Sequence, residues 1–304
     1  MSEYLLAGSA LLACLASGVA GVQGVQMVRY RGEGQNVLLA VVAAVAALAG
    51  ATLFVLTLRS PAAFFTALRH GTTGIAIYLY ATLALVVGCV VAIVMAKRSE
   101  DGSVARWVGV LLAVLAVVLA FGSALGFLKS AFVKVDGRFW AVLAFFVGLA
   151  LCLGAFAQLL IGALRGDEEA RSFGRPASLA GAVALVLGTA AFACWFLVGP
   201  GAGASGAAKA AFSFNGYTAN MGAAAGATAA GQLADLAAGN AALFWGGAVA
   251  CGLVLPLVCG IGAFVTGRRS GEKAVGLALP FGAVGLAAAL VGGYCLCLAV
   301  GMLV

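Results

Sequence analysis

The residues able to do chemistry in this chain lie in the connections between long apolar stretches. The connection after the second apolar stretch carries Arg59, Ser60, Arg69 and the chain's one histidine, His70. A later connection adds one acid among three bases, namely Lys129, Lys134, Asp136 and Arg138. Such a basic rim could receive an acidic partner protein or a polar headgroup. The alternative is that these long side chains only reach out to the membrane interface.

Two short helices are expected to lie on the membrane surface within the connections. Ser60-Pro61 ends the preceding helix and suits the first turn of a new one. Phe64, Phe65 and Leu68 then share one side of that new helix, which is typical of an interfacial segment. The second is expected over Thr228–Ala238, inside the long Ala- and Gly-rich connection 200–240, where a loose loop is the alternative.

Three other kinds of site are disfavoured by the same sequence. A dihaem cytochrome b needs several axial histidines, and this chain has one. The eight cysteines lie inside apolar stretches without C-x-x-C spacing, so neither a metal site nor a bound cluster is predicted. Residues 201–206 match G-x-G-x-x-G by letter, but no strand precedes them, so they do not predict a nucleotide site.

Composition determines the elements that must position these residues. Hydrophobic residues make up 64% of the chain and charged residues 9%. Each crossing of hydrocarbon needs about 20 apolar residues in a helix. We therefore predict an all-α membrane protein, a bundle of eight transmembrane helices in a single domain over residues 1–304. The expected spans are 4–27, 36–58, 73–96, 105–128, 139–164, 177–199, 241–266 and 275–303.

The distribution of basic residues predicts the orientation. Of the 17 Lys and Arg residues, 11 fall in the odd-numbered connections and 6 in the others. Basic residues are retained on the cytoplasmic side, so both termini are expected to be extracytoplasmic. The expected location is the cell membrane, which the chain crosses several times.

The stretch Leu56–Tyr80 resembles the membrane anchor subunit of dimethyl sulfoxide reductase, the DmsC type. That family's run reads Leu-His-x-Gly-x-Pro-x-x-Ala-x-x-x-Leu, and here Ser60-Pro61, Phe64 and Leu68-Arg69 fall in step with it. Residues 290–293 and 300–302 are similar to the family's last span. Eight spans and a length near 300 residues also fit.

The resemblance implies a role in anaerobic respiration. Anchors of this family hold an iron–sulfur subunit and a molybdopterin catalytic subunit on the extracytoplasmic side of the membrane. They oxidise menaquinol and pass its electrons to the iron–sulfur clusters, while binding no redox cofactor themselves. The chain would thus be a non-catalytic subunit of an oxidoreductase complex, one that carries the quinol-oxidation site. Nucleic acid is not an expected partner.

The rim and its neighbours supply residues that could take these roles in place of the family's own. His70 and Asp136 are expected to accept protons from the quinol. Arg59 and Arg69 would orient its headgroup, together with Ser60, Tyr78 and Tyr80. The side chains expected to dock the iron–sulfur subunit are Lys129, Lys134 and Arg138.

Four positions depart from the family pattern. Thr57 replaces a histidine, Leu79 lies near the position of a glutamate, and Ala289 and Gly293 stand where Glu and Arg are expected. A proton acceptor must lie within hydrogen-bond reach of the proton, and threonine cannot take that role from histidine. An anchor that has lost quinol chemistry is therefore one alternative function.

A small transporter or permease is the second alternative. It would ordinarily show internal repeats, broken spans and polar groups at mid-membrane. Pro256 and Pro280 are the main helix breakers within the spans. No repeat is evident between the two halves of the sequence, and all ten acidic residues fall near span ends or in connections.

Overall fold

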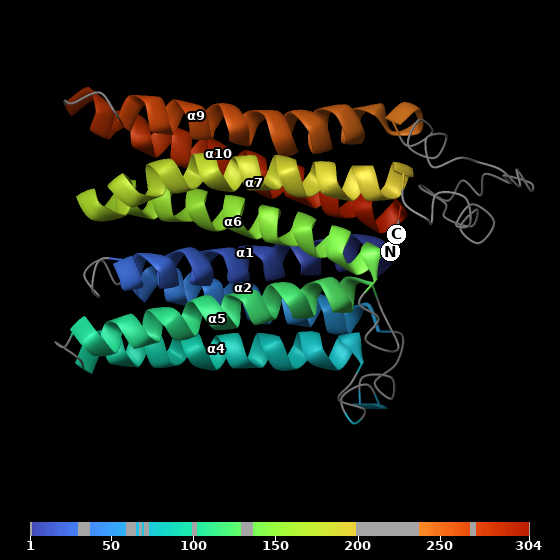
Figure 1. Cartoon of the computed structure of the whole chain (residues 1–304), viewed down its shortest axis with the longest axis horizontal. Helices are drawn as coiled ribbons and strands as arrows, with labels where there is room; N and C mark the ends of the chain where they lie inside the picture. Colours follow the sequence, from blue (N-terminus) through green and yellow to red (C-terminus); the bar gives the residue numbers. More distant parts are fainter. Residues whose placement is uncertain are drawn as a thin grey trace, which may run out of the picture.

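The part of the chain that the computed structural model describes is a bundle of long helices (Figure 1). Within it, eight helices are long and apolar enough to cross a membrane, and no strand occurs. The predicted all-α, eight-helix membrane fold is confirmed, and the chain is a multi-pass membrane protein. The described residues are 2–29, 37–58, 65–66, 69, 73–98, 102–128, 136–198, 237–267 and 272–303.

The helices lie close to the predicted spans and run side by side in alternating directions (Figure 1). Helix α1 begins, and helix α10 ends, at the same end of the bundle, which we call the termini end. The helices are α1 (Ser2–Arg29), α2 (Val37–Leu56), α4 (Gly74–Arg98), α5 (Gly102–Phe127), α6 (Gly137–Arg165), α7 (Glu168–Val198), the π-helix η2 (Ala242–Val254), α9 (Leu255–Gly267) and α10 (Glu272–Leu303).

The helices form two rings of four that share one arrangement. In the first ring α1 packs on α2 and α5, and α4 closes the ring between them. In the second ring α6 packs on α7 and α10, and η2–α9 closes it. The rings meet where α1 packs on α6, flanked by contacts of α1 with α10 and of α5 with α6. These are the contacts that a two-fold relation between the halves produces, although the sequence shows no evident repeat.

Glycine brings α1 and α6 into backbone contact where the two rings meet. A Cβ at Gly18 would overlap the carbonyl of Ala150, and one at Gly154 would overlap the carbonyl of Gly18. Helices in lipid gain little from hydrophobic burial, so small residues that allow close approach stabilise their packing. The two glycines therefore define the junction between the rings.

Helix α7 begins well before the predicted span 177–199, because its start is set by a cap rather than by the apolar run. The carboxylate of Asp167 accepts a hydrogen bond from the backbone N–H of Ala170 at 3.0 Å. Just before it, Gly166 ends α6 with a φ of 70°, a left-handed conformation that glycine adopts without strain. The two helices are thus joined by a very tight turn, and α7 continues through Pro176.

The seventh span has an irregular backbone. Its first half, η2, is a π-helix, and α9 continues it with Pro256 at the second position. Proline lacks the N–H that a regular helix would use, and π-helical segments often occur near functional sites. This span is the most irregular of the described helices.

The ring junction generates the first prediction. Replacing Gly18 with alanine adds a methyl group that collides with the backbone of α6, so the helices must separate. Overpacking of this kind typically costs about 1–3 kcal/mol. Thermal unfolding of the purified chain in detergent should therefore show a lower midpoint for Gly18→Ala.

The matched control is Gly246→Ala, because a Cβ at Gly246 meets no atom within 4 Å. This variant should unfold close to the wild-type midpoint. Equal midpoints for the two variants would contradict the proposed role of the glycine contact.

Candidate functional site

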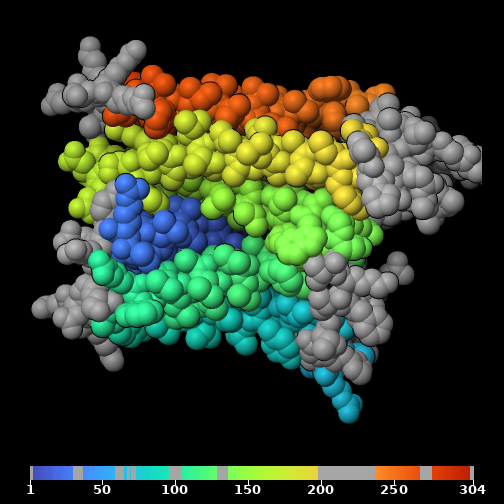
Figure 2. Space-filling view, viewed as in Figure 1, coloured from blue at the N-terminus to red at the C-terminus, as the bar shows by residue number. Residues whose placement is uncertain are grey.

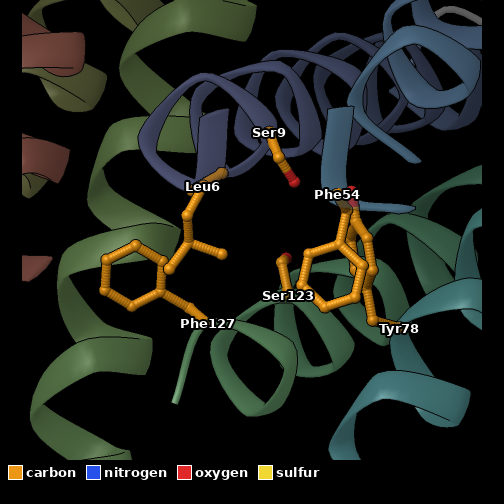
Figure 3. Close-up of a pocket in the computed structure, with 7 residues that line it drawn as sticks. Leu6, Ser9, Phe54, Tyr78, Ser123 and Phe127 are labelled. Atoms are coloured by element: carbon orange, nitrogen blue, oxygen red, sulfur yellow. The ribbon is translucent and has the colours of Figure 1, made fainter. Parts of the chain in front are cut away.

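A small pocket lies inside the first ring near the termini end. Its volume of about 10 Å³ is enough for roughly one water molecule, and it combines hydroxyl groups with apolar side chains. In Figure 3 the hydroxyls of Ser9 and Ser123 point into the space between Phe127 on one side and Phe54 and Tyr78 on the other. The lining residues are Leu6, Ser9, Ala10, Phe54, Tyr78, Ser123 and Phe127.

Tight packing of α4 on α5 fixes Tyr78 in this pocket. A Cβ at Gly126 would lie 3.0 Å from the Cβ of Tyr78, so the absence of a side chain there makes room for the tyrosine. The ring of Tyr78 meets that of Phe54 edge-on, with centroids 4.8 Å apart. Tyr78 is 2% exposed. Its orientation is therefore set by three helices, α2, α4 and α5.

The pocket hydroxyls differ in what they can still bind. Ser123 Oγ donates to the carbonyl of Leu119 at 2.5 Å, which leaves its oxygen able to accept. The buried hydroxyl of Tyr78 lies beside Ser9 and Thr82, but no described residue completes a hydrogen bond of normal geometry with it. A buried polar group without a partner costs free energy, so a water or a ligand oxygen in the pocket would be stabilising.

The chemistry of the pocket is that of binding rather than of proton transfer. Its hydroxyls can donate to and accept from a polar ring substituent, whereas no side chain lining it is a base near neutral pH. Its volume of about 10 Å³ is far below the roughly 300–1,000 Å³ of typical ligand pockets. A two-ring headgroup would therefore need side chains such as Phe127 to move.

The structure places some of the predicted site residues near this pocket and others apart from it. Tyr78 lines it, while Tyr80 is half exposed on α4. Asp136 caps α6, its Oδ1 accepting from the N–H of Phe139 at 3.0 Å, and Arg138 is half-buried two residues later. Arg69 is exposed. The predicted residues outside the described part are Arg59, Ser60, His70, Lys129 and Lys134.

Most residues of the two predicted interfacial helices lie outside the described part of the chain. Of the segment around Phe64 and Leu68, only residues 65–66 and 69 are described. The segment Thr228–Ala238 lies outside the described residues except for its last two positions, which are helical. Both helices therefore stay predictions.

The four positions that depart from the family pattern are closely packed. Thr57 donates its hydroxyl to the carbonyl of Phe54 at 2.6 Å, and Ala289 is fully buried. A Cβ at Gly293 would lie 2.8 Å from Leu149 Cδ1. Leu79 packs against the core. At Ala289 and Gly293 a longer polar side chain would not fit without rearrangement.

A second polar cluster lies at the opposite end of α1, and the sequence reasoning missed it. The amide Nε2 of Gln158 on α6 donates to Oε1 of Gln26 on α1, and both residues are almost fully buried. The remaining Gln26 Nε2 and Gln158 Oε1 have no partner among the described residues. The sequence does contain a signal for this cluster. Its glutamine amides lie within apolar stretches, and burying such amides in lipid without a partner is costly.

The cysteines form no recognisable metal centre in the described part of the chain. All eight are unpaired thiols, and five of them are buried. Within the described ranges, no three His, Cys, Asp or Glu side chains gather closely enough to bind a metal ion.

Comparisons with known proteins leave the resemblance untested. No protein-family model, curated protein or solved structure matches this chain. The likeness of Leu56–Tyr80 to the anchor family therefore stays a prediction.

The amide pair generates the second prediction. Gln158→Leu leaves the Gln26 amide buried without its partner and should destabilise the bundle by about 1–2 kcal/mol. The double variant Gln26→Leu/Gln158→Leu removes both polar groups and should recover part of that loss. Unfolding free energies in mixed detergent, arranged as a double-mutant cycle, measure the coupling.

Strict additivity of the two single substitutions would contradict an interaction between these amides. Ser172→Ala is a suitable control, because its hydroxyl bonds only within its own helix at an exposed position. It should leave the unfolding free energy nearly unchanged.

Proposed function

We propose that this chain is the membrane anchor subunit of a molybdopterin oxidoreductase complex similar to dimethyl sulfoxide reductase. In this proposal it resides in the cell membrane with both termini extracytoplasmic. It binds menaquinol and passes the electrons to an iron–sulfur subunit, which in turn supplies a molybdopterin catalytic subunit. The eight-helix bundle is compatible with this role.

The observation that carries the proposal is the position of Tyr78. This residue was expected to contact quinol, and it lies buried in a hydroxyl-containing pocket near the termini end. Phe54 and Tyr78 flank the connection that carries Arg59, Ser60, Arg69 and His70. A headgroup held in an opened form of the pocket would thus lie close to the bases expected to serve it.

Oxidation of a quinol in that position requires one route for its protons and another for its electrons. Menaquinol releases two protons and two electrons as it becomes menaquinone. The pocket hydroxyls can orient its oxygen atoms, while the protons would go to His70 and Asp136. The second carboxylate oxygen of Asp136 can accept a proton while Oδ1 keeps its capping bond. The electrons would leave for a cluster of the partner subunit docked at the termini end.

An anchor without quinol chemistry is supported by one observation. The pocket is smaller than a menaquinol headgroup requires. Thr57, Ala289 and Gly293, which replace polar residues of the family pattern, are packed against their neighbours. Such a chain would still hold the two partner subunits at the membrane. It would differ in having no quinol-dependent activity.

A transporter is favoured by two other observations. The π-helix η2 with Pro256 makes the seventh span irregular, and the two rings repeat one arrangement. Many transporters combine broken helices with repeated halves. However, within the described ranges none of the buried polar residues is charged, whereas ion-coupled transport generally uses charged groups in the membrane.

Purification of the tagged chain from its native membranes in mild detergent tests the anchor role. We expect stoichiometric iron and molybdenum by elemental analysis, with a cluster protein and a large catalytic subunit identified by mass spectrometry. A chain that purifies alone and metal-free, under conditions that keep other membrane complexes intact, would contradict the proposal and favour the transporter.

The quinol site is tested with the assembled complex. Tyr78→Phe removes a hydroxyl from the pocket but keeps the ring that packs on Phe54. Loss of one hydrogen bond to a bound ligand costs about 0.5–1.5 kcal/mol, so KM for a menaquinol analogue should rise roughly 2- to 12-fold. Steady-state reduction of the iron–sulfur clusters by that analogue measures the effect.

Tyr4→Phe is the matched control, because Tyr4 is 41% exposed and does not line the pocket. His70→Ala in the same assay should lower kcat if this histidine takes a proton. Unchanged kinetics in both Tyr78→Phe and His70→Ala, in a complex that still assembles, would leave only the anchoring role.

A further inference from the structure

The membrane-facing surface is hollowed on both sides of α1. Figure 2 shows α1 in blue, set back between the green to yellow surface of α6 and α7 and the teal-green surface of α5. The hollow follows from close helix crossings, since a Cβ at Gly24 would lie 2.5 Å from the carbonyl of Gly109 on α5. Helix α1 therefore lies deeper than its neighbours at this face.

The hollow consists of two apolar grooves separated by α1. The first runs between α1 and α5, has a volume of about 540 Å³, and is lined mainly by Val25, Val28, Val114 and Val117. The second runs between α1, α6 and α7, has a volume of about 180 Å³, and includes Leu151 and Phe173. Val25 lines both grooves and forms the ridge between them.

Positive charge lies at one end of both grooves, the end opposite the termini. Arg29 lines the first groove, and its guanidinium lies 6.0 Å from the ring centroid of Phe173 in the second. Arg106 is exposed on α5 one turn before Val110, which also lines the first groove. Residues four apart share a helix face, so Arg106 lies toward the same end of that groove.

Among the side chains that the structure describes, the acidic groups near this end are on the α6–α7 turn. Asp167 is engaged in capping α7, while Glu168 is exposed and Glu169 half exposed. The guanidinium of Arg171 donates to the carbonyls of Gly166 and Asp167. Arg29 on α1 and Arg106 on α5 supply the positive charge here, and the Arg29 guanidinium reaches toward Phe173 of α7.

We propose that this surface binds one anionic two-chain glycerophospholipid that straddles α1, with an acyl chain in each groove and its phosphate at Arg29. Two parallel apolar grooves with a cation at their common end match the shape and charge of such a lipid. Arginine binds phosphate through paired, charge-assisted hydrogen bonds, and basic sites between transmembrane helices bind anionic headgroups.

The grooves fit acyl chains better than a partner helix. Helix–helix contacts in lipid favour a continuous face of small residues. Small residues such as Gly21, Ala177 and Gly181 line much of the second groove, but the ridge at Val25 divides the hollow, and branched valines form the wall of the larger groove. Flexible chains can fill two narrow grooves separately, whereas one helix cannot.

The proposed lipid would connect the two rings. Its first chain contacts helices of the first ring, and its second reaches α6 and α7 of the second ring. Binding to the folded bundle alone stabilises it by mass action. An anionic lipid should therefore stabilise the protein more than a zwitterionic lipid with identical acyl chains.

The test uses the full chain, stripped of lipid in detergent and titrated with phosphatidylglycerol or phosphatidylcholine of the same acyl composition. Native mass spectrometry should detect one retained phosphatidylglycerol per chain, and the thermal unfolding midpoint should rise. Arg29→Gln should weaken retention roughly tenfold or more, because a charge-assisted contact is lost. Arg165→Gln removes a charge at the same end of the bundle and should retain the lipid.

A second pair of variants tests the groove itself. Val114→Trp fills the first groove and should reduce retention without changing charge. Val87→Trp, at a similarly exposed position on α4, should not. Equal retention of both lipids, or unchanged retention in Arg29→Gln and Val114→Trp, would overturn the proposal. A stable dimer that Val114→Trp dissociates would also overturn it and assign the surface to a second copy of the chain.

Discussion

The contact between the backbones of α1 and α6 determines how the rest of this protein is arranged. Gly18 and Gly154 place the two helices so close that no side chain fits between them. This joins two four-helix rings through equivalent helices and leaves α1 in contact with both rings. Helix α1 is accordingly among the most deeply buried spans, and side chains along its length contact several other helices.

The two polar clusters and the lipid-facing hollow all depend on this central position of α1. Near its start, Ser9 faces α2, α4 and α5 and contributes to the hydroxyl pocket. Near its end, Gln26 meets Gln158 of the second ring. In between, Ser17 donates to the carbonyl of Ala116 on α5 at 2.9 Å. Hydrocarbon cannot satisfy such groups, so their position inside the bundle is a physical requirement.

The number and approximate limits of the helices could be predicted because crossing the membrane imposes length and apolarity on each span. The start of α7 could not be predicted from apolarity, since the Asp167 cap determines it. The pocket could not be predicted from the sequence for another reason. Ser9 and Ser123 are small residues in ordinary apolar stretches, and only the packing of α1 on α5 brings them together. The pairing of Gln26 with Gln158 likewise depends on which helices become neighbours, and no local pattern records that.

The tight turn at Gly166 and Asp167 has a consequence for how the chain enters the membrane during synthesis. It leaves almost no slack between α6 and α7, and glycines such as Gly148 and Gly181 hold the two helices at backbone distance. The first turns of α7 carry Glu168, Glu169, Arg171 and Arg175, which oppose its partition into lipid as an isolated segment. The more apolar α6 emerges first and can receive α7 as a partner. The two helices are thus suited to leaving the translocation channel together as one hairpin, whose pairing precedes assembly of the second ring.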